Sequence, residues 1–198
     1  YGKFENIRKN VQLRNLILTS VKDVLSPIKR KGYYLVEGRK IKKVPANAEI
    51  IWWEKFLLDG RKYHGPFHTV CKAEDPAVIL YSGGTTGTMK GILLSNLNFN
   101  ALSQQIVATN PMFRPGDKML AVMPIFHGFG LGVCIHSMLA NGGRCLLIPR
   151  FNPESYAKLL KKHKPNFIAG VPTLYEALLR IKSLDRVDLS CLKGVFSG

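Results

Sequence analysis

From residue 77 to the C-terminus, short apolar runs alternate with stretches of helical periodicity. The apolar runs predict buried strands at residues 77–81, 118–123, 144–148, 166–170 and 192–196. The periodic stretches predict helices at residues 96–109, 128–139, 153–163 and 173–181, and Ser95 is a favourable N-cap for the first of them. This alternation predicts an α/β fold with a mainly parallel sheet flanked by helices.

The first 75 residues follow a different pattern. Residues 15–19 predict a short buried strand, whereas residues 20–48 are charged, broken by Pro and Gly, and read as loop. An apolar face with two tryptophans predicts a helix at residues 49–58, and residues 59–75 read as a linker. We therefore divide the chain into a basic lead-in segment, residues 1–75, and an α/β subdomain, residues 76–198.

The run YSGGTTGTMKG, from Tyr81 to Gly91, directly follows the strand predicted at residues 77–81. Its glycines allow backbone N–H groups to approach anionic oxygens, and its hydroxyls add donors or a metal ligand. Lys90 adds a mobile positive charge. Between a strand pattern and a helix pattern, this composition predicts a phosphate-binding loop rather than a flexible surface turn.

The loop fits neither of two common nucleotide motifs. Lys90 precedes a glycine, which excludes the Walker pattern, and the adjacent Gly83 and Gly84 exclude the dinucleotide fingerprint. The run instead resembles the signature of the adenylate-forming enzymes: acyl- and aryl-CoA synthetases, peptide-synthetase adenylation domains and luciferases. Met89 stands where this signature usually has proline. The double glycine is most similar to that of bacterial medium- and long-chain fatty-acid–CoA ligases.

Three further segments resemble motifs of the same enzymes, in the same order and with fitting spacing. They are PIFHGFG at Pro124–Gly130, GVPTLY at Gly170–Tyr175 and GVFSG at Gly194–Gly198. The similarity extends upstream to residues 16–27, so it covers essentially the whole chain. It implies part of the large N-terminal domain of an adenylate-forming enzyme. Three of the motifs follow predicted strands, and ligands gather at the carboxyl ends of strands in such sheets.

The resemblance implies a ligase that joins a carboxylate to ATP, forming acyl-adenylate and pyrophosphate, and then transfers the acyl group to CoA. Fatty acid, ATP and CoA are then substrates, used with Mg²⁺. The resemblance implies that Ser82 contacts magnesium and that ATP is bound by Tyr81, Ser82, Gly83, Gly84, Thr85, Thr86, Gly87, Thr88, Lys90 and Gly91. It implies that the acid substrate is bound by His127, Gly128, Phe129, Gly170, Val171 and Thr173.

At 198 residues the chain is shorter than a complete ligase of this kind. In these enzymes the magnesium-holding glutamate, the ribose-binding aspartate, the hinge and the adenylation lysine lie downstream of the last matched motif. The resemblance therefore implies a fragment without a complete set of catalytic residues, inactive by itself. Related substrates stay open: an aryl acid, an amino acid, or a carrier-protein thiol in place of CoA.

His127 and Phe129 each have two interpretations. His127 either shapes the pocket around the acyl carboxylate or serves as a core or helix-capping side chain, and we do not assign it as a general base. Phe129 suits the wall of an acyl tunnel and the hydrophobic core equally well.

Net charge is +16, with 16 basic and 8 acidic residues at 1–75 and 13 and 5 at 76–198. The basic clusters are short, which favours solvated surface charge over a nucleic-acid-binding module. An alternative places the basic segment 24–48 against an anionic membrane, which would put the protein peripherally at the inner membrane face.

The chain has four cysteines and no C-x-x-C pair: Cys71, Cys134, Cys145 and Cys191. We therefore expect reduced thiols in a cytoplasmic protein.

Overall fold

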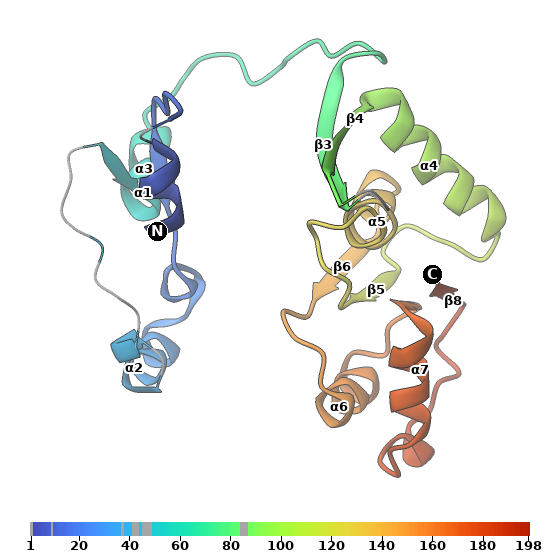
Figure 1. Cartoon of the computed structure of the whole chain (residues 1–198). Helices are drawn as coiled ribbons and strands as arrows, with labels where there is room; N and C mark the ends of the chain where they lie inside the picture. The colour runs from blue at the N-terminus through green and yellow to red at the C-terminus, as the bar shows by residue number, and fades with distance from the viewer. Residues whose placement is uncertain (1, 9, 37, 41–43, 45–48, 84–86) are drawn as a thin grey trace. The chain divides into compact units, whose positions relative to one another are not determined.

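A computed structural model describes residues 2–8, 10–36, 38–40, 44, 49–83 and 87–198 of the chain (Figure 1). The chain forms two compact units, an N-terminal unit at residues 1–68 and a C-terminal unit at residues 69–198. Among the described residues, no helix combines the length and the hydropathy that crossing a membrane requires.

The N-terminal unit is built around two short parallel strands, and the strand predicted near residue 17 is confirmed. Leu16 of β1 pairs with Ile50 of β2, and Leu18 pairs with Trp52. The elements of this unit are α1 Gly2–Arg8, β1 Leu16–Leu18, η1 Val21–Val24, α2 Pro27–Val36, η2 Gly38–Lys40, β2 Ile50–Trp52 and α3 Trp53–Gly60.

Two predictions for this unit were wrong. Residues 20–48 were read as loop, but α2 occupies Pro27–Val36. Proline suits the first helical position, because its missing N–H has no partner there in any helix. The helix expected from residue 49 begins at Trp53, since the β-branched Ile50 and Ile51 form strand β2 beside β1. Parts of segment 24–48 lie outside the described residues.

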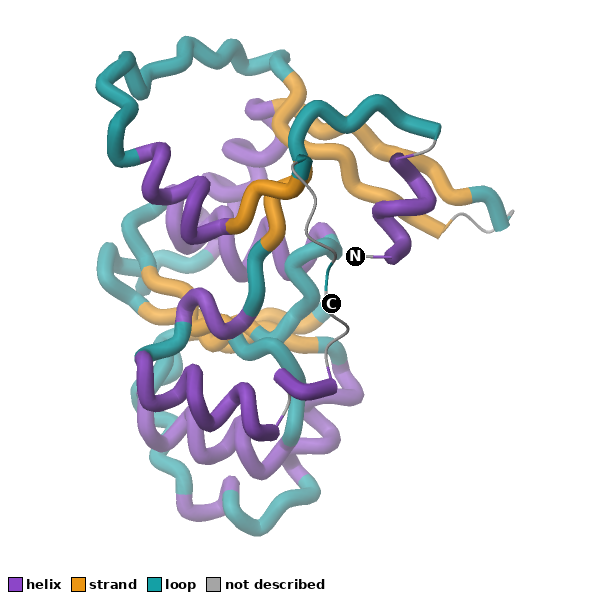
Figure 2. Tube along the Cα trace, turned by 90° about the vertical axis from the view of Figure 1, so that its left-hand side faces the viewer, coloured by secondary structure: helices purple, strands orange, loops and turns teal. Residues whose placement is uncertain are grey.

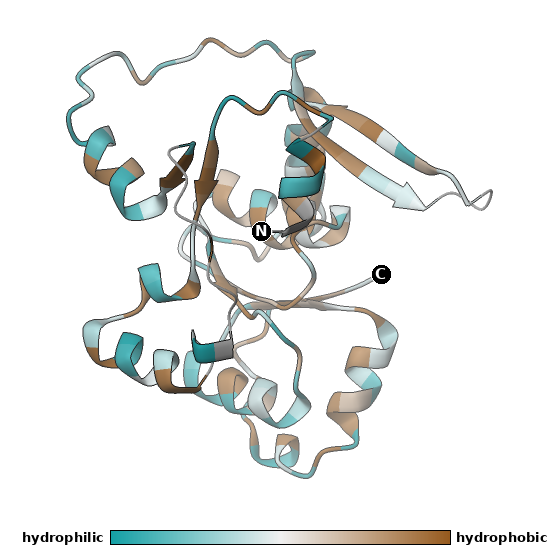
Figure 3. Cartoon of the chain, turned by 60° about the vertical axis from the view of Figure 1, so that its left-hand side comes forward, coloured by the Kyte–Doolittle hydropathy of each residue, from teal (hydrophilic) through white to brown (hydrophobic). Residues whose placement is uncertain are grey.

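The C-terminal unit begins with an antiparallel hairpin of β3 Pro76–Gly83 and β4 Met89–Ser95. Figure 3 shows both strands hydrophobic along much of their length and paler towards the connecting loop. The phosphate run was expected between a strand and a helix of the parallel sheet, and this was wrong. The run joins two strands of a separate sheet, and α4, Asn96–Thr109, follows only after β4.

The main sheet has the strand order β6-β5-β7-β8, and every neighbouring pair is parallel. Its strands are β5 Lys118–Ala121, β6 Arg144–Leu147, β7 Phe167–Gly170 and β8 Gly194–Ser197. The remaining helices are α5 Ser137–Ala140, α6 Pro153–His163, α7 Pro172–Leu179, a π-helix at Phe129–His136 and a 3-10 turn, η4, at Leu184–Arg186. Figure 2 shows helices on both sides of this sheet, which confirms the predicted α/β fold class.

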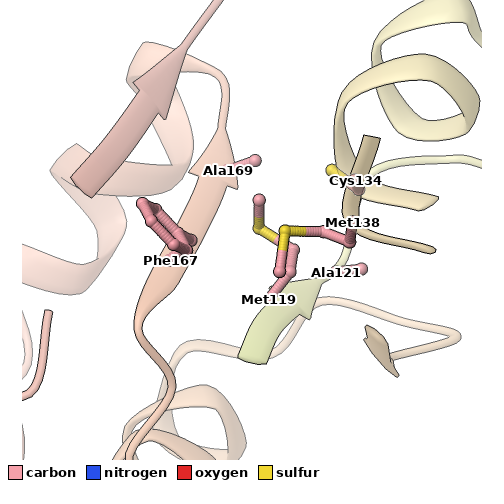
Figure 4. Close-up of a cluster of buried hydrophobic side chains, with 6 residues drawn as sticks. All are labelled: Met119, Ala121, Cys134, Met138, Phe167 and Ala169. Atoms are coloured by element: carbon pink, nitrogen blue, oxygen red, sulfur yellow. The ribbon is translucent and has the colours of Figure 1, made fainter. Parts of the chain in front are cut away.

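Alternating residues of the strands supply two hydrophobic cores, one on each face of the sheet. On one face, Met119 and Phe167 pack against Cys134 and Met138 of the helical segment, as Figure 4 shows. The cluster on the other face consists of Leu120, Tyr156, Leu160, Ile168, Leu174 and Leu178. Burial of both faces holds the strands in a fixed register. Because every neighbouring pair is parallel, their carboxyl ends lie at one edge of the sheet.

A polar network ties the strands together at the opposite, amino-terminal edge of the sheet. Lys193 Nζ lies 2.8 and 2.9 Å from the two carboxylate oxygens of Asp117, a residue only 8% exposed. Asp117 also accepts a hydrogen bond from the backbone N–H of Arg114 at 2.8 Å. The Asn166 side chain accepts from the backbone N–H of Lys118 at 2.9 Å. These bonds fix the starts of β5, β7 and β8 and so stabilise the register of these strands up to their carboxyl ends.

The buried Cys134 thiol and the half-buried Tyr175 hydroxyl are two of the groups that make stability depend on alkaline pH. Burial raises the pKa of the Cys134 thiol from 9.0 to about 12, and burial likewise raises the pKa of Tyr175 from 10.0 to about 12. The fold favours the neutral forms, so their contribution is complete below pH 9 and declines as pH rises from 9 to 12. For Cys134 the decline reaches roughly 1.4 kcal/mol per pH unit.

We therefore expect the urea midpoint of the chain to fall more steeply above pH 9 than between pH 7 and 9. Urea unfolding followed by circular dichroism at pH 7, 8, 9, 10 and 11 measures this. Replacing the thiol, Cys134→Ala, should flatten the fall between pH 9 and 10, whereas Cys71→Ala, at an exposed cysteine, should leave it unchanged. An unaltered slope in Cys134→Ala contradicts the assignment.

Candidate functional site

The hairpin presents the phosphate run at its closed end. Ser82 pairs directly with Lys90 across the two strands, and Gly83 pairs with Met89. Directly opposed residues point to the same face with roughly 5 Å between their Cβ atoms. The Ser82 hydroxyl and the Lys90 ammonium group therefore share one face beside the loop. Gly84, Thr85 and Thr86 lie outside the described residues.

Two glycines in the run have a structural requirement. Gly87 has a φ of 76°, in the left-handed region that side chains disfavour. Gly91 lies opposite Tyr81, and a Cβ built on it would lie 3.2 Å from Ile79 Cγ2 and 3.4 Å from the Tyr81 ring. Glycine at this position lets the Tyr81 ring lie close to the backbone of β4. Lys90 and Thr88 are exposed, so the face that Lys90 shares with Ser82 is open to a ligand. Tyr81 is 68% exposed on the opposite face of the hairpin, because successive strand residues alternate faces.

The second predicted segment, around His127, follows β5 and leads into the π-helix. The His127 N–H donates to the carbonyl of Pro124 at 3.1 Å, and the His127 carbonyl accepts from the Leu131 N–H at 2.9 Å. The Phe129 N–H donates to Nδ1 of the His127 ring at 3.2 Å. An accepting Nδ1 carries no proton, so the ring's proton is on Nε2. His127 is exposed, and Nε2–H remains able to donate to a ligand.

The structure supports the helix-capping interpretation of His127, and the pocket interpretation stays a prediction. Nδ1 caps the start of the helical segment, and Nε2 is the group that a pocket role would use. Phe126, beside it, is 82% exposed and was not predicted as a site residue. Phe126 lies inside the Pro124–Gly130 motif.

Close approaches bring the predicted segments together. A Cβ on Gly128 would lie 3.4 Å from Leu80 Cδ1, so the helical segment contacts the hairpin strand that leads into the phosphate run. A Cβ on Gly198 would lie 3.6 Å from the Phe129 ring, which places that ring beside the end of β8. Gly130 lies against the carbonyl of Pro124 with no room for a side chain. The glycines are therefore the positions where the elements meet.

The third segment forms the junction between β7 and α7. Gly170 ends β7, and its Cβ would lie 2.9 Å from Leu174 Cδ2. Val171 has extended backbone before α7, and Val171 and Thr173 are both exposed at the carboxyl edge of the sheet. The Gly198 N–H donates to the Gly170 carbonyl at 3.3 Å, which joins this segment to the fourth motif.

Tyr175 is a residue that the sequence reasoning did not assign to the site. Its hydroxyl donates to the carbonyl of Phe196 at 2.5 Å, which holds the end of β8 against α7. The hydroxyl thereby positions the end of strand β8. Tyr175 closes the GVPTLY motif, so the motif itself carried the signal.

The described residues offer no group of three or more His, Cys, Asp or Glu side chains that could hold a metal ion. The predicted magnesium contact, Ser82, contributes one half-buried hydroxyl. Magnesium prefers about six oxygen ligands and commonly takes several of them from substrate phosphates and water. The residues present fit a magnesium ion that is bound mainly by a nucleotide, with Ser82 as one added oxygen.

The sequence that forms this site matches a known family. The family model described as AMP-binding enzyme matches residues 9–198. The chain belongs to the AMP-binding enzyme family. This membership confirms the resemblance to adenylate-forming enzymes that the four motifs carried.

Relatives within the family share a ligase name and differ in the acid. The chain is 32% identical over 191 residues to a long-chain-fatty-acid–CoA ligase of Bacillus subtilis, covering 92% of this chain and 33% of that protein. It is 33% identical over 142 residues to a probable 4-coumarate–CoA ligase of Dictyostelium discoideum, covering 71% of this chain and 25% of that protein. The chain thus spans about a third or less of the length of these relatives.

Among solved structures, ATP-bound MatB from Rhodopseudomonas palustris is similar, with a TM-score of 0.68 and 25% sequence identity. The match covers the whole of this chain and 37% of MatB. The AMP-binding fold therefore extends over both units of the chain, and the family assigns it to the adenylate-forming ligases.

Proposed function

We propose that the chain is the ATP- and acyl-binding part of an ATP-dependent fatty-acid–CoA ligase. The observation that carries the proposal is the hairpin that sets Ser82 opposite Lys90 and contacts, through Leu80, the helical segment of His127. The segment proposed to bind phosphate and the segment proposed to bind the carboxylate therefore contact one another, which supports a single site. The similarity to fatty-acid–CoA ligases supports the acid, and relatives named for 4-coumarate make an aryl acid the second candidate.

In the first half-reaction, a carboxylate oxygen attacks the α-phosphorus of ATP, and the bond to pyrophosphate breaks. Negative charge then accumulates on the leaving pyrophosphate, and preorganised donors stabilise it. We assign this role to the ammonium group of Lys90, the hydroxyls of Ser82 and Thr88, and the backbone N–H groups of Gly87 and Thr88. A nucleotide-bound magnesium ion supplies further charge neutralisation.

The acid is held by the segment that follows β5. His127 Nε2–H is available to donate to the carboxylate, which orients an oxygen without any proton transfer. The ring of Phe129, beside the end of β8, forms an apolar wall for the acyl chain. In the second half-reaction, the thiol of CoA displaces AMP from the acyl-adenylate and a thioester forms.

The 198-residue chain alone is expected to bind Mg·ATP without making acyl-adenylate or acyl-CoA. The described residues lack an acidic cluster for magnesium, and the relatives are about three times as long. Isothermal titration with Mg·ATP, and a pyrophosphate-release assay with palmitate, test the two halves of this expectation. Sustained turnover by the purified chain would show that no further residues are needed, and absent ATP binding would contradict the assigned loop.

The acid is identified with the complete polypeptide that carries this chain. Carboxylate-dependent ATP–pyrophosphate exchange is measured with fatty acids of graded length, 4-coumarate, benzoate and amino acids. Exchange in one window of fatty-acid lengths is the expected result. Exchange with 4-coumarate and none with fatty acids would replace the proposed substrate while keeping the adenylation chemistry. A folded protein that gives no exchange with any acid would overturn both.

A further inference from the structure

The surface of the C-terminal unit carries a groove lined mainly by basic side chains. Its volume is about 400 Å³, within the range of small-molecule sites. The residues that line it are Ala157, Lys158, Lys161, Lys182, Ser183, Arg186 and Val187. None of them belongs to the proposed ATP or acyl site, and Figure 1 shows α6 and α7 at the opposite end of this unit from the hairpin.

The two walls of the groove come from α6 and from the turn that follows α7. On α6, Lys161 lies one helical turn after both Ala157 and Lys158, so these three residues border one side of the helix. The Ser183 hydroxyl donates to Glu154 Oε2 at 2.6 Å and so fastens the second wall to the first turn of α6. The spacing between the walls is therefore fixed by a side-chain hydrogen bond.

The second wall, the turn after α7, also packs against the hydrophobic core. Leu184 and Val187 pack against the hydrophobic cluster on this face of the sheet. The N–H of Val187 donates to the carbonyl of Leu184 at 2.9 Å and closes η4. Lys182 and Arg186 consequently project from a short turn whose backbone is held in place on both sides.

The groove has a surplus of positive charge. In the part of the chain that the structure describes, Lys158, Lys161, Lys182 and Arg186 form no ion pair. Of the neighbouring carboxylates, Glu154 accepts the Ser183 hydroxyl, and Asp188 lies 4.0 Å from Lys164. Asp185 is exposed on η4 and does not line the groove. Four cations that face one concavity attract a ligand with several negative charges.

We infer that this groove binds a soluble organic phosphate that carries two or more phosphate groups. The planar guanidinium of Arg186 suits bidentate contact with phosphate oxygens, and the three lysines supply point charges around it. Ala157, which is only 1% exposed, and the half-buried Val187 form the apolar base of the groove, against which the organic part would lie. The inference is independent of the proposed ligase function, since it uses no residue of the phosphate run.

The test is an NMR titration of the 198-residue chain with sodium tripolyphosphate, followed through backbone amides. We expect saturable shifts at residues 157–161 and 182–187, weakened by added salt. The double variant Lys161→Gln/Arg186→Gln should raise the dissociation constant at these amides about tenfold or more. The matched control, Lys162→Gln/Arg180→Gln, removes two charges from α6 and the end of α7 outside the groove, and should stay within about twofold.

Circular dichroism first establishes that both double variants retain the fold. Shifts confined to residues 81–91, or equal weakening in both variants, would overturn the inference. Binding to phosphatidylglycerol vesicles without any tripolyphosphate shift in the groove would also overturn it, because the charge would then serve a lipid surface instead of a soluble phosphate.

Discussion

Replacing Gly130 by alanine is expected to lower the free energy of unfolding of the chain by roughly 3 kcal/mol or more. A Cβ at this position would lie 2.1 Å from the Pro124 carbonyl oxygen and 2.8 Å from the Met123 carbonyl oxygen. These are backbone atoms, so the contact is relieved only if the junction between β5 and the π-helix moves. Urea unfolding followed by circular dichroism measures the loss.

Gly128→Ala is the matched control, two residues earlier in the same segment. Gly128 has helical φ and ψ of −53° and −37°, and its Cβ would make only an ordinary contact with Leu80 at 3.4 Å. Alanine suits a helical backbone better than glycine, so we expect a change within about 0.5 kcal/mol. Equal stability of the Gly130 and Gly128 variants would show that the Pro124 carbonyl does not fill this space.

Replacing Lys90 by methionine is expected to slow ATP–pyrophosphate exchange by the complete polypeptide by about 100-fold or more. Methionine keeps an unbranched apolar side chain but removes the charge that offsets the developing pyrophosphate. Lys90 is exposed and its side chain makes no hydrogen bond within the described residues, so the stability of the fold should be unaffected. Initial rates of exchange at saturating acid give the comparison.

Lys162→Met serves as the control for this substitution, because Lys162 is an exposed lysine of α6 away from the hairpin. Its exchange rate should match that of the unmodified protein. If Lys90→Met exchanges at the unmodified rate while binding Mg·ATP normally, the hairpin lysine has no part in the reaction.

The sequence patterns were most accurate for helices whose capping residues can be recognised in the sequence. The helices at Asn96–Thr109 and Pro153–His163 have the predicted bounds. Each has a side-chain cap that can be read in the sequence: Ser95 Oγ accepts from the N–H of Asn98, and Asn152 Oδ1 accepts from the N–H of Ser155. A cap interacts with residues three positions away, so local sequence is sufficient to define it.

The prediction was weaker where an element depends on a distant partner. Strand β4 was missed because its strand character follows from pairing with β3, which the apolar residues Ile92–Leu94 do not specify alone. The helix expected at residues 128–139 is present, but its first part is a π-helix at Phe129–His136. Within it, Gly132 packs against α4, where a Cβ would lie 2.8 Å from Leu102 Cδ2, and no local pattern specifies this contact.

The motifs identified which segments form the site, but not how they meet. The contact of the Phe129 ring with Gly198 joins residues far apart in the chain, and no local pattern reports it. The bond of Nδ1 of His127 to the Phe129 N–H is likewise a matter of geometry, and it decides which ring nitrogen faces a ligand.

The central position of β5 has a consequence for how the polypeptide folds as it is synthesised. β5 pairs with β6, where Lys118 meets Arg144, and with β7, where Met119 meets Phe167. The second pairing closes a longer loop and costs roughly 0.5 kcal/mol more in chain entropy. We expect β5 to join β6 first, and its other edge then stays open on the ribosome until β7 emerges. During that interval the apolar edge is exposed to unintended pairing, so a slow stretch of translation between β6 and β7 would favour aggregation.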